Sequence, residues 1–301
     1  MDTPLVSICS ITYNHAPYIR QCLDGFLMQK TKFRYEIIIH DDASTDGTTE
    51  IIKEYAEKHP DLITPIFQKE NQYSKGIRGM FPRFCFPHAK GKYIALCEGD
   101  DYWTDPLKLQ KQMDFLEANP DFVMCGHHVE SLYEFEHKYV PFNIGINGTF
   151  KLSDLVHRSV FCPTLSVLFK KDSLNIVRYL SYRQSMDVVL VYHLLTQGNG
   201  FCLDDTMAVY RIHGGGVWSA TSDESHLLTN IDVRFSIYDV EKSPESAYFL
   251  QNFISQLGRF WMIKHPIIMI NALSRIYTQF GTRHLFHLLI SIIVKRNHNI
   301  N

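Results

Sequence analysis

The stretch Tyr93-Ile94-Ala95-Leu96-Cys97-Glu98-Gly99-Asp100-Asp101-Tyr102 decides the fold, because it joins an apolar run to an acidic turn. Five apolar residues in a row predict a buried strand, and the glycine with its paired aspartates predicts the turn that ends it. Two adjacent carboxylates repel each other unless a cation or a hydroxyl-rich ligand neutralises them. Two interpretations therefore stay open on this stretch alone: a solvated turn, or a site for a divalent cation that carries a phosphorylated ligand.

The sequence around this strand alternates β-branched runs with amphipathic helical segments from residue 5 to residue 125. Such alternation is typical of α/β proteins with a doubly wound, mostly parallel sheet that carries helices on both faces. We expect strands at 5–11, 35–40, 63–68 and 93–97, each followed by a helix, of which the one at 48–58 has the clearest capping turn.

The α/β pattern continues, with a less periodic connection at 130–160, to about residue 220. We therefore predict one catalytic domain over 1–220, with a first half at 1–125 and a second half at 126–220. Strand patterns disappear beyond it, and 221–301 is predicted to form a helical C-terminal appendage. The helices expected there cover 226–240, 246–264, 266–280 and 283–296.

Composition excludes several classes of protein. A hydrophobic fraction of 45% and a net charge of -2 give no general attraction to nucleic acid, so no nucleic-acid partner is expected. The seven cysteines form no C-x-x-C pair, which is typical of reduced, buried thiols in the cytoplasm. The first four residues do not resemble a signal segment, and no apolar stretch reaches the roughly 18 to 20 residues that span a bilayer.

Polar residues follow three of the expected strands at the point where each strand ends. Tyr13 and Asn14 follow the first, Asp42 follows the second, and Asp100 and Asp101 follow the fourth. Ligands of open parallel sheets bind beyond the carboxyl ends of the strands, so these side chains predict one shared site.

Phosphate binding at this site would need a cation, because the chain has neither a G-x-G-x-x-G turn nor a P-loop. We expect Asp101 to hold a divalent cation, helped by Lys75, Arg78 or Arg83. The alternative for each of these three basic residues is an ordinary surface position, which is favoured because Lys and Arg are mostly exposed.

Three segments, taken in order, resemble family 2 glycosyltransferases of the GT-A fold. They are Val6 to Asn14, Glu36 to Thr48 and Gly91 to Trp103, and the resemblance covers roughly residues 4 to 215. It implies a metal-dependent, inverting, non-processive enzyme that moves one hexosyl or N-acetylhexosaminyl group from a nucleotide-diphosphate sugar, UDP-linked, to an acceptor hydroxyl. The acceptor would be a growing polysaccharide or a lipid-linked oligosaccharide.

The resemblance also implies a role for each matching residue of the donor site. Tyr13 would pack on the nucleotide base, Asp42 would accept a hydrogen bond from it, and Asp100 would bind the ribose or assist the metal. Trp103 would stack on a sugar face, or only anchor the helix that begins near Asp105. The expected nucleotide-sugar-binding set is Thr12, Tyr13, Asn14, Asp42, Arg78, Asp100 and Trp103.

The resemblance further implies a metal site and a catalytic base. Asp101 would coordinate Mn²⁺ or Mg²⁺, and His213, in Tyr210-Arg211-Ile212-His213, would reach the metal or the diphosphate. Asp187, in Ser185-Met186-Asp187-Val188-Val189-Leu190, would be the base that deprotonates the acceptor hydroxyl. A carboxylate at the start of a helix is also an ordinary N-cap, which is the alternative for Asp187.

Two other functions remain open from the sequence. A nucleotidyltransferase acting on sugar phosphates also uses metal-bound carboxylates, although Thr12-Tyr13-Asn14-His15 lacks the glycine-rich and basic segment expected after its first strand. A non-catalytic nucleotide-sugar-binding protein of the same fold is the other.

The helical region carries its own prediction. Its apolar residues at 260–263 and 267–269, with Lys264 and Arg275 nearby, would rest as a peripheral contact on the cytoplasmic face of the inner membrane. Alternatively they pack on the catalytic domain or on a partner chain.

Overall fold

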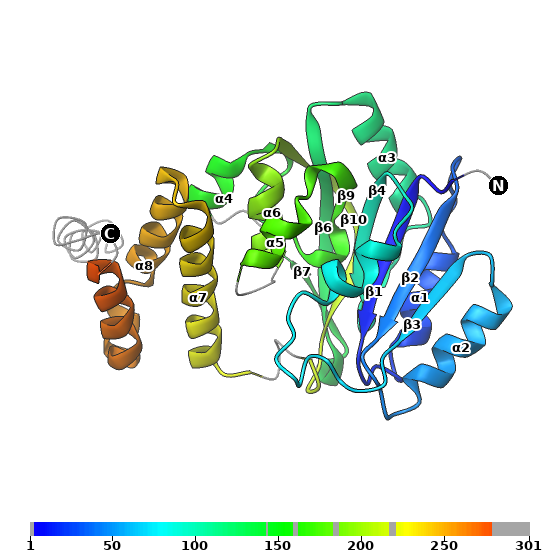
Figure 1. The fold of residues 1–301 in the computed structure, drawn as a ribbon, viewed down its shortest axis with the longest axis horizontal. Coiled ribbons are helices and arrows are strands. Elements are labelled where there is room, and N and C mark those ends of the chain that lie inside the picture. The colour runs from blue at the N-terminus through cyan, green and yellow to red at the C-terminus, as the bar shows by residue number, and fades with distance from the viewer. Residues whose placement is uncertain (1–2, 143, 159–161, 183–186, 217–220, 279–301) are drawn as a thin grey trace. The chain divides into compact units, whose positions relative to one another are not determined.

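A computed structural model of the chain describes residues 3–142, 144–158, 162–182, 187–216 and 221–278, without the side chains of 256–263. The chain divides into two compact units, Met1–Ala220 and Thr221–Asn301. The first contains one curled sheet with its helices, and the described part of the second is helical (Figure 1).

The first half of the sheet is parallel. Its strands are β1 (Val6–Thr12), β2 (Tyr35–Asp41), β3 (Ile63–Phe67) and β4 (Tyr93–Glu98), in the spatial order β3-β2-β1-β4. Both faces of β1, β2 and β4 are buried, as their continuous apolar runs require. The four strands expected from the sequence are therefore confirmed.

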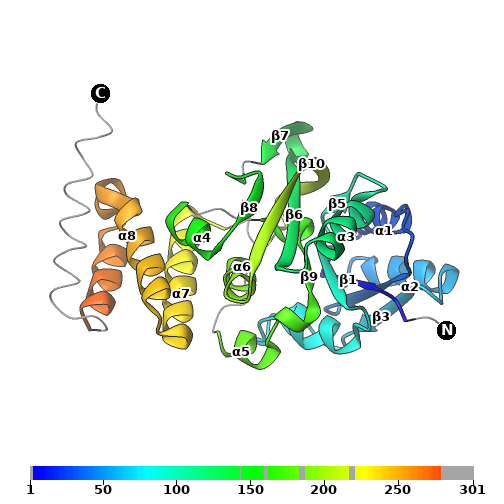
Figure 2. The ribbon, with the colours of Figure 1, turned by 90° about the horizontal axis from the view of Figure 1, so that it is seen from above.

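Helices lie around the sheet of the first unit (Figure 2), and along the chain they alternate with its strands. Helix α2 begins at Thr48 and ends at Lys58, as predicted, and it packs against β3. The segment before β4 is a π-helical turn (Phe81–Cys85) and a 3₁₀ turn (Phe86–His88) rather than one α-helix. The remaining helices are α1 (Ile19–Leu27), α3 (Lys108–Ala118), α4 (Leu152–Arg158), α5 (Ile176–Ser181) and α6 (Asp187–Leu195).

The second half makes the sheet mixed. Strand β9 (Leu168–Lys170) runs antiparallel to both β4 and β6 (Phe122–Tyr133), so β6 has the direction of β4, and β10 (Asn199–Ile212) runs parallel to β6. The carboxyl ends of β1, β2, β4, β6 and β10 consequently lie at one edge. Strands β5 (Tyr102–Trp103), β7 (Lys138–Phe142) and β8 (Gly148–Phe150) pair antiparallel with β10, β6 and β10.

The stretch 130–160, which the sequence predicted to be an aperiodic connection, contains regular structure. It holds the end of β6, a 3₁₀ turn at Glu134–Glu136, β7, β8 and α4. Strand β7 is exposed along most of its length and contains Pro141, which occurs on edge strands. An exposed edge strand lacks the apolar alternation on which sequence prediction depends.

All seven cysteines are free and buried in this unit. Cys22, Cys97 and Cys125 belong to an apolar core that also includes Ile8, Ile37 and Ile39. Burial raises the pKa of the Cys97 and Cys125 thiols above the usual range, so both stay protonated at neutral pH.

The second unit has its own core. Helices α7 (Asp223–Glu241) and α8 (Pro244–Lys264), with a further helical segment over 266–278, enclose Leu227, Phe235, Ile254 and Ile276. The helices expected at 226–240 and 246–264 are confirmed, and the one expected at 283–296 lies outside the described residues. Within the part of the chain that is described, no helix is long and apolar enough to cross a membrane.

The residues expected to touch a membrane divide between the surface and this core. Ile267 is exposed, whereas Ile268 and Met269 are buried within the unit. Arg275 forms an ion pair with Asp232 at 2.6 Å and so is already neutralised. The side chains of 260–263 lie outside the described residues, and membrane contact stays a prediction.

Candidate active site

The acidic turn lies at the edge where the parallel strands end. Gly99 packs so closely on β1 that an added Cβ would lie 2.7 Å from Cβ of Thr12, and only glycine fits there. The two aspartates that follow point to different partners. Asp101 is buried and its Oδ1 accepts a 2.7 Å hydrogen bond from the main-chain N–H of Arg211, whereas Oδ2 of Asp100 lies 3.1 Å from Nε2 of His213.

Arg211, at the end of β10, fastens this turn to the rest of the site. Its Nε donates to the main-chain oxygen of Asp100 at 2.8 Å. The two terminal nitrogens donate to Glu134, beyond β6, and to Gln21, on α1. A buried guanidinium with every side fixed in this way holds the turn in one conformation.

Two aromatic residues complete the surroundings of Asp100. Nε2 of His15 lies 3.7 Å from Oδ2 of Asp100. The ring of Tyr18 lies 4.5 Å from that of His213 and stacks under the guanidinium of Arg211 at 4.7 Å. These contacts bring together residues that follow β1 and β4 with residues at the end of β10.

The carboxylates here have pKa values that differ because of their surroundings. Burial raises the pKa of Asp101 well above its usual range. Burial also opposes ionisation of Asp100, but hydrogen bonding to His213 and the proximity of His15 hold its pKa below the usual value. The pKa of Glu98 rises to about 8 because of burial and the negative charges of Asp100 and Asp187.

Asp187 begins α6 and belongs to the same electrostatic environment, since its charge acts on Glu98. Its Oδ1 accepts a 2.8 Å hydrogen bond from the N–H of Val188. Burial raises the pKa of Asp187 to about 6, which places its titration near neutral pH, as a general base requires. The contact with Val188 also agrees with a capping role, so its catalytic role stays a prediction.

The donor set around Asp100 suits a divalent cation in chemistry but is incomplete. Within the described ranges, no group of three or more His, Cys, Asp or Glu side chains is arranged to hold a metal ion. Asp100 and His213 supply a carboxylate oxygen and an imidazole nitrogen, and phosphate oxygens of a donor with water would complete the coordination sphere. Asp101, whose Oδ1 is bound by the N–H of Arg211, has its other carboxylate oxygen left for a ligand, and its role as a metal ligand stays a prediction.

The residues that follow β1 and β2 hydrogen-bond to neighbouring loops. Both carboxylate oxygens of Asp42 accept main-chain hydrogen bonds, from Gln72 at 2.7 Å and from Tyr73 at 3.0 Å. Asn14 has a left-handed backbone, with φ of 54°, and its side-chain oxygen accepts from the N–H of Thr45. These contacts fix the shape of the rim, and contact with a base stays a prediction for Asp42.

The other residues predicted to bind the donor differ in their exposure and contacts. Tyr13 is 43% exposed at the rim, where its ring is accessible to a ligand. Thr12 has a buried hydroxyl without a hydrogen-bond partner in the described structure. Arg78 donates to the main-chain oxygen of Tyr73 at 2.9 Å and stacks on that residue's ring, so it braces the loop that Asp42 holds.

Trp103 requires a correction. Its side chain is 2% exposed, its indole N–H donates to the main-chain oxygen of Leu165 at 3.0 Å, and its backbone lies against Gly25 of α1. A ring buried in this way cannot stack on a sugar. Trp103 anchors the polypeptide after the acidic turn, which was the alternative interpretation of the sequence.

Sequence reasoning missed several residues that surround Asp100. Glu98 was treated only as part of the turn, and His15 and Tyr18 were assigned no role. Arg211 was quoted only as part of the motif that ends in His213. Glu134 carried no signal, because it lies in the stretch that was predicted to be aperiodic.

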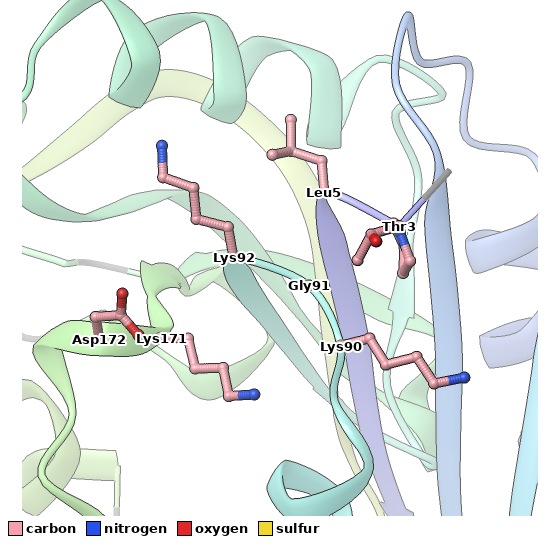
Figure 3. A pocket seen from close by; sticks show the side chains of 8 residues that line it. Thr3, Leu5, Lys90, Gly91, Lys92, Lys171 and Asp172 are labelled. Atoms are coloured by element: carbon pink, nitrogen blue, oxygen red, sulfur yellow. The ribbon is translucent and has the colours of Figure 1, made fainter. Parts of the chain in front are cut away.

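A pocket on the opposite edge of the sheet is separate from this site (Figure 3). Its volume is about 430 Å³, and Leu5, Gly91 and Lys92, which precede β1 and β4, line it with Lys171 and Asp172. It lies at the amino ends of the strands and contains none of the predicted site residues.

Comparison with known proteins identifies the family. The sequence model of glycosyl transferase family 2 matches residues 7–175, more than half of the chain. The chain belongs to glycosyl transferase family 2. The matched region of this family 2 protein contains β1 to β4 and the acidic turn.

Sequence relatives match most of this chain, and a solved structure shares its fold. An uncharacterized protein of Mycobacterium tuberculosis is 40% identical over 72% of this chain, and the match spans only 62% of that protein's own length. The Escherichia coli protein WfaP, named a UDP-Glc:α-D-GlcNAc-diphosphoundecaprenol β-1,3-glucosyltransferase, is 30% identical over 76% of this chain and 88% of its own. The crystal structure of S. aureus TarS 1–349 with UDP-GlcNAc superposes with a TM-score of 0.71 at 16% identity, covering 96% of this chain and 88% of TarS, and it confirms the fold class.

Proposed function

We propose that this protein is an inverting glycosyltransferase that transfers one sugar from a UDP-linked donor to an acceptor hydroxyl in polysaccharide or lipid-linked oligosaccharide synthesis. The observation that carries the proposal is the 3.1 Å approach of Asp100 and His213 at the edge where β4 and β10 end, with the charge of Asp187 near enough to raise the pKa of Glu98. Membership of family 2 and the activity for which WfaP is named support the donor and the class of acceptor.

In the proposed reaction, the carboxylate of Asp187 accepts the proton of the acceptor hydroxyl. The acceptor oxygen then bonds to the anomeric carbon of the sugar on the face opposite the diphosphate, and the bond from that carbon to the diphosphate oxygen breaks. The configuration inverts, and the nucleoside diphosphate leaves with the bonding electrons. A pKa of about 6 leaves Asp187 ionised at neutral pH and ready for this step.

Asp100 and His213 are the proposed holders of Mn²⁺ or Mg²⁺. Such an ion would stabilise the charge that accumulates on the leaving diphosphate. Arg211 would keep Asp100 oriented by binding its main-chain oxygen, and Asp101 would keep Arg211 in place. Tyr13 and Asp42 would receive the nucleotide base at the ends of β1 and β2, with Asn14 holding the two loops together.

A calorimetric screen of nucleotide sugars, with and without Mn²⁺, tests the proposal directly. We expect one UDP-sugar to bind more tightly with Mn²⁺ and to be converted to UDP in the presence of acceptor. The Asp187→Asn variant should keep Mn²⁺-dependent binding but lose turnover. Failure of every nucleotide sugar to bind would contradict the proposed function, and full turnover by Asp187→Asn would contradict the assignment of the base.

A further inference from the structure

The β6–β7 hairpin carries aromatic side chains on its exposed tip. Tyr133 ends β6, Phe135 lies in the 3₁₀ turn and Tyr139 lies in β7, and their side chains are 39%, 85% and 52% exposed. A phenylalanine ring that is 85% exposed loses little by meeting a ligand and gains from leaving water. We call Tyr133, Phe135 and Tyr139 the hairpin patch.

The hairpin patch is joined to the candidate active site by direct contacts. Glu134, beside Phe135, forms an ion pair with Arg211 at 2.8 Å. A Cβ added to Gly214, the residue after His213, would lie 3.6 Å from Cζ of Phe135, so that ring borders the segment that carries His213. The hydroxyl of Tyr139 lies 3.2 Å from the hydroxyl of Tyr102, at the end of the acidic turn.

The order of the strands places the hairpin patch on the side of Asp100 away from the proposed nucleotide site. The sheet runs β2-β1-β4-β9-β6-β10, and β7 pairs with the same edge of β6 as β9, because β10 occupies the other edge. Tyr13 and Asp42 follow β1 and β2, the acidic turn follows β4, and the hairpin follows β6, which has the same direction as β4. A molecule that approaches Asp100 from the side opposite the nucleotide therefore meets the hairpin patch.

We propose that the hairpin patch binds a pyranose unit of the acceptor by stacking it on Phe135, next to the site of transfer. This proposal rests on the proposed function and names the surface that selects the acceptor. Sugar rings present apolar C–H faces that pack on aromatic rings, while their hydroxyls hydrogen-bond at the rim. The tyrosines of the patch and the carboxylate of Glu136 are exposed and can supply that polar rim.

The charges around the patch favour a saccharide over a membrane surface. Glu136 follows Phe135 as an exposed carboxylate, whereas Glu134 is ion-paired with Arg211. Lys138 is one lysine in the turn, so the turn is not a polybasic segment. Anionic lipids attract polybasic segments and repel acidic ones. Phe135 borders Gly214 and Tyr139 contacts Tyr102, so the patch adjoins the segments that carry His213 and Asp100.

Three substitutions at Phe135 separate a stacked sugar from a simple apolar contact. Phe135→Tyr keeps a ring, Phe135→Leu keeps apolar surface without a ring, and Phe135→Ala removes both. Val177→Ala, on α5, is the control, since Val177 is 82% exposed and lies outside the site. Because Phe135 is so exposed, all four variants should melt at the same temperature as the wild type, which thermal unfolding checks.

The probes are an immobilised array of bacterial oligosaccharides, presented to the protein with UDP and Mn²⁺, and vesicles of phosphatidylglycerol and phosphatidylcholine. We expect the wild type and Phe135→Tyr to bind the same glycans. Phe135→Leu and Phe135→Ala should lose roughly 2- to 10-fold in apparent affinity, and Val177→Ala should lose none.

Each alternative occupant gives a different result. Equal glycan binding by wild type and Phe135→Ala, or no glycan binding by the wild type, would overturn the proposal. Vesicle binding that survives in Phe135→Leu and is lost in Phe135→Ala would assign the patch to a lipid surface. Self-association that Phe135→Ala abolishes in sedimentation would assign it to a second copy of the chain. UDP binding to the wild type, measured separately by calorimetry, shows whether the proposed function itself has failed.

Discussion

Nε2 of His213 lies 3.1 Å from Oδ2 of Asp100, although 113 positions separate the two residues along the chain. The contact connects the end of β10 to the turn after β4, and the main-chain hydrogen bond from Arg211 to Asp101 repeats that connection two residues earlier on β10. The two aspartates therefore have different contacts, and we propose different roles for them, Asp100 at the metal site and Asp101 in support of the turn.

Asp100→Ala should remove most of the Mn²⁺-dependent gain in UDP binding, since it deletes the carboxylate that faces His213. Asp101→Ala should instead lower stability by about 1–3 kcal/mol, because it leaves the buried N–H of Arg211 unpaired. Calorimetry with and without Mn²⁺, together with denaturant unfolding, measures both effects. This order is the reverse of the one assigned from the sequence, and a greater loss of Mn²⁺-dependent binding in a well-folded Asp101→Ala would restore that assignment.

Asp187 should impose a pH dependence on transfer. Its pKa is raised to about 6 by burial, and only the ionised carboxylate accepts a proton, so kcat/KM should increase as pH rises through about 6 and then level off. Asp187→Asn should be slower by about 10²- to 10⁴-fold, with no inflection near pH 6. Initial-rate profiles of the two proteins make the comparison, and an inflection that persists in Asp187→Asn would assign it to another group.

Lys108 should make stability depend on pH. It is fully buried, its Nζ lies 3.9 Å from the ring centroid of Trp103, and burial lowers its pKa to about 7. An unfolded lysine titrates near pH 10.4, so between about 7 and 10 the unfolded chain binds more protons, and the free energy of unfolding rises with pH.

The test compares wild type with Lys108→Met by urea unfolding at pH 7 and pH 9. The wild type should gain stability relative to the variant as pH rises, by at most about 1.4 kcal/mol per pH unit. If the free energy of unfolding changed equally in the two proteins between pH 7 and pH 9, Lys108 would have the same pKa in the folded and the unfolded chain, which would contradict the prediction.

Trp103→Phe should destabilise the protein without weakening donor binding. It removes the N–H that reaches Leu165 and leaves that buried carbonyl unpaired, at a cost of about 1–3 kcal/mol. Thermal unfolding and UDP-sugar titration provide the two measurements. A donor affinity that falls while the melting temperature stays constant would show that Trp103 contributes to sugar binding.

The sequence predicted the parallel half of the sheet well because its signals are local. Continuous β-branched runs such as Ile37 to Ile39 define strands buried on both faces, and Thr48 to Lys58 follows a turn rich in capping side chains. The edge strand β7 has no such signal, since its exposed side chains need no apolar alternation. Its absence from the prediction also removed Glu134 from the candidate site.

The distribution of roles within the site depended on contacts that no local pattern contains. Asp100 and Asp101 are adjacent and chemically identical, and only the position of β10 determines that one meets an imidazole and the other a main-chain N–H. The sequence around Trp103 is compatible with a ligand contact or with a core position. Its contacts with Gly25 of α1 and with a carbonyl in the turn at Thr164–Ser166 come from distant parts of the chain and place it in the core.

The burial of every native thiol makes this chain convenient for site-directed labelling. Because Cys9, Cys22, Cys85, Cys97, Cys125, Cys162 and Cys202 are all enclosed, a maleimide dye should react slowly with the folded wild type. A single cysteine introduced at an exposed position, such as Val177→Cys, should then take up the dye selectively without replacement of any native cysteine. Fluorescence experiments on the working protein can therefore start from the natural sequence.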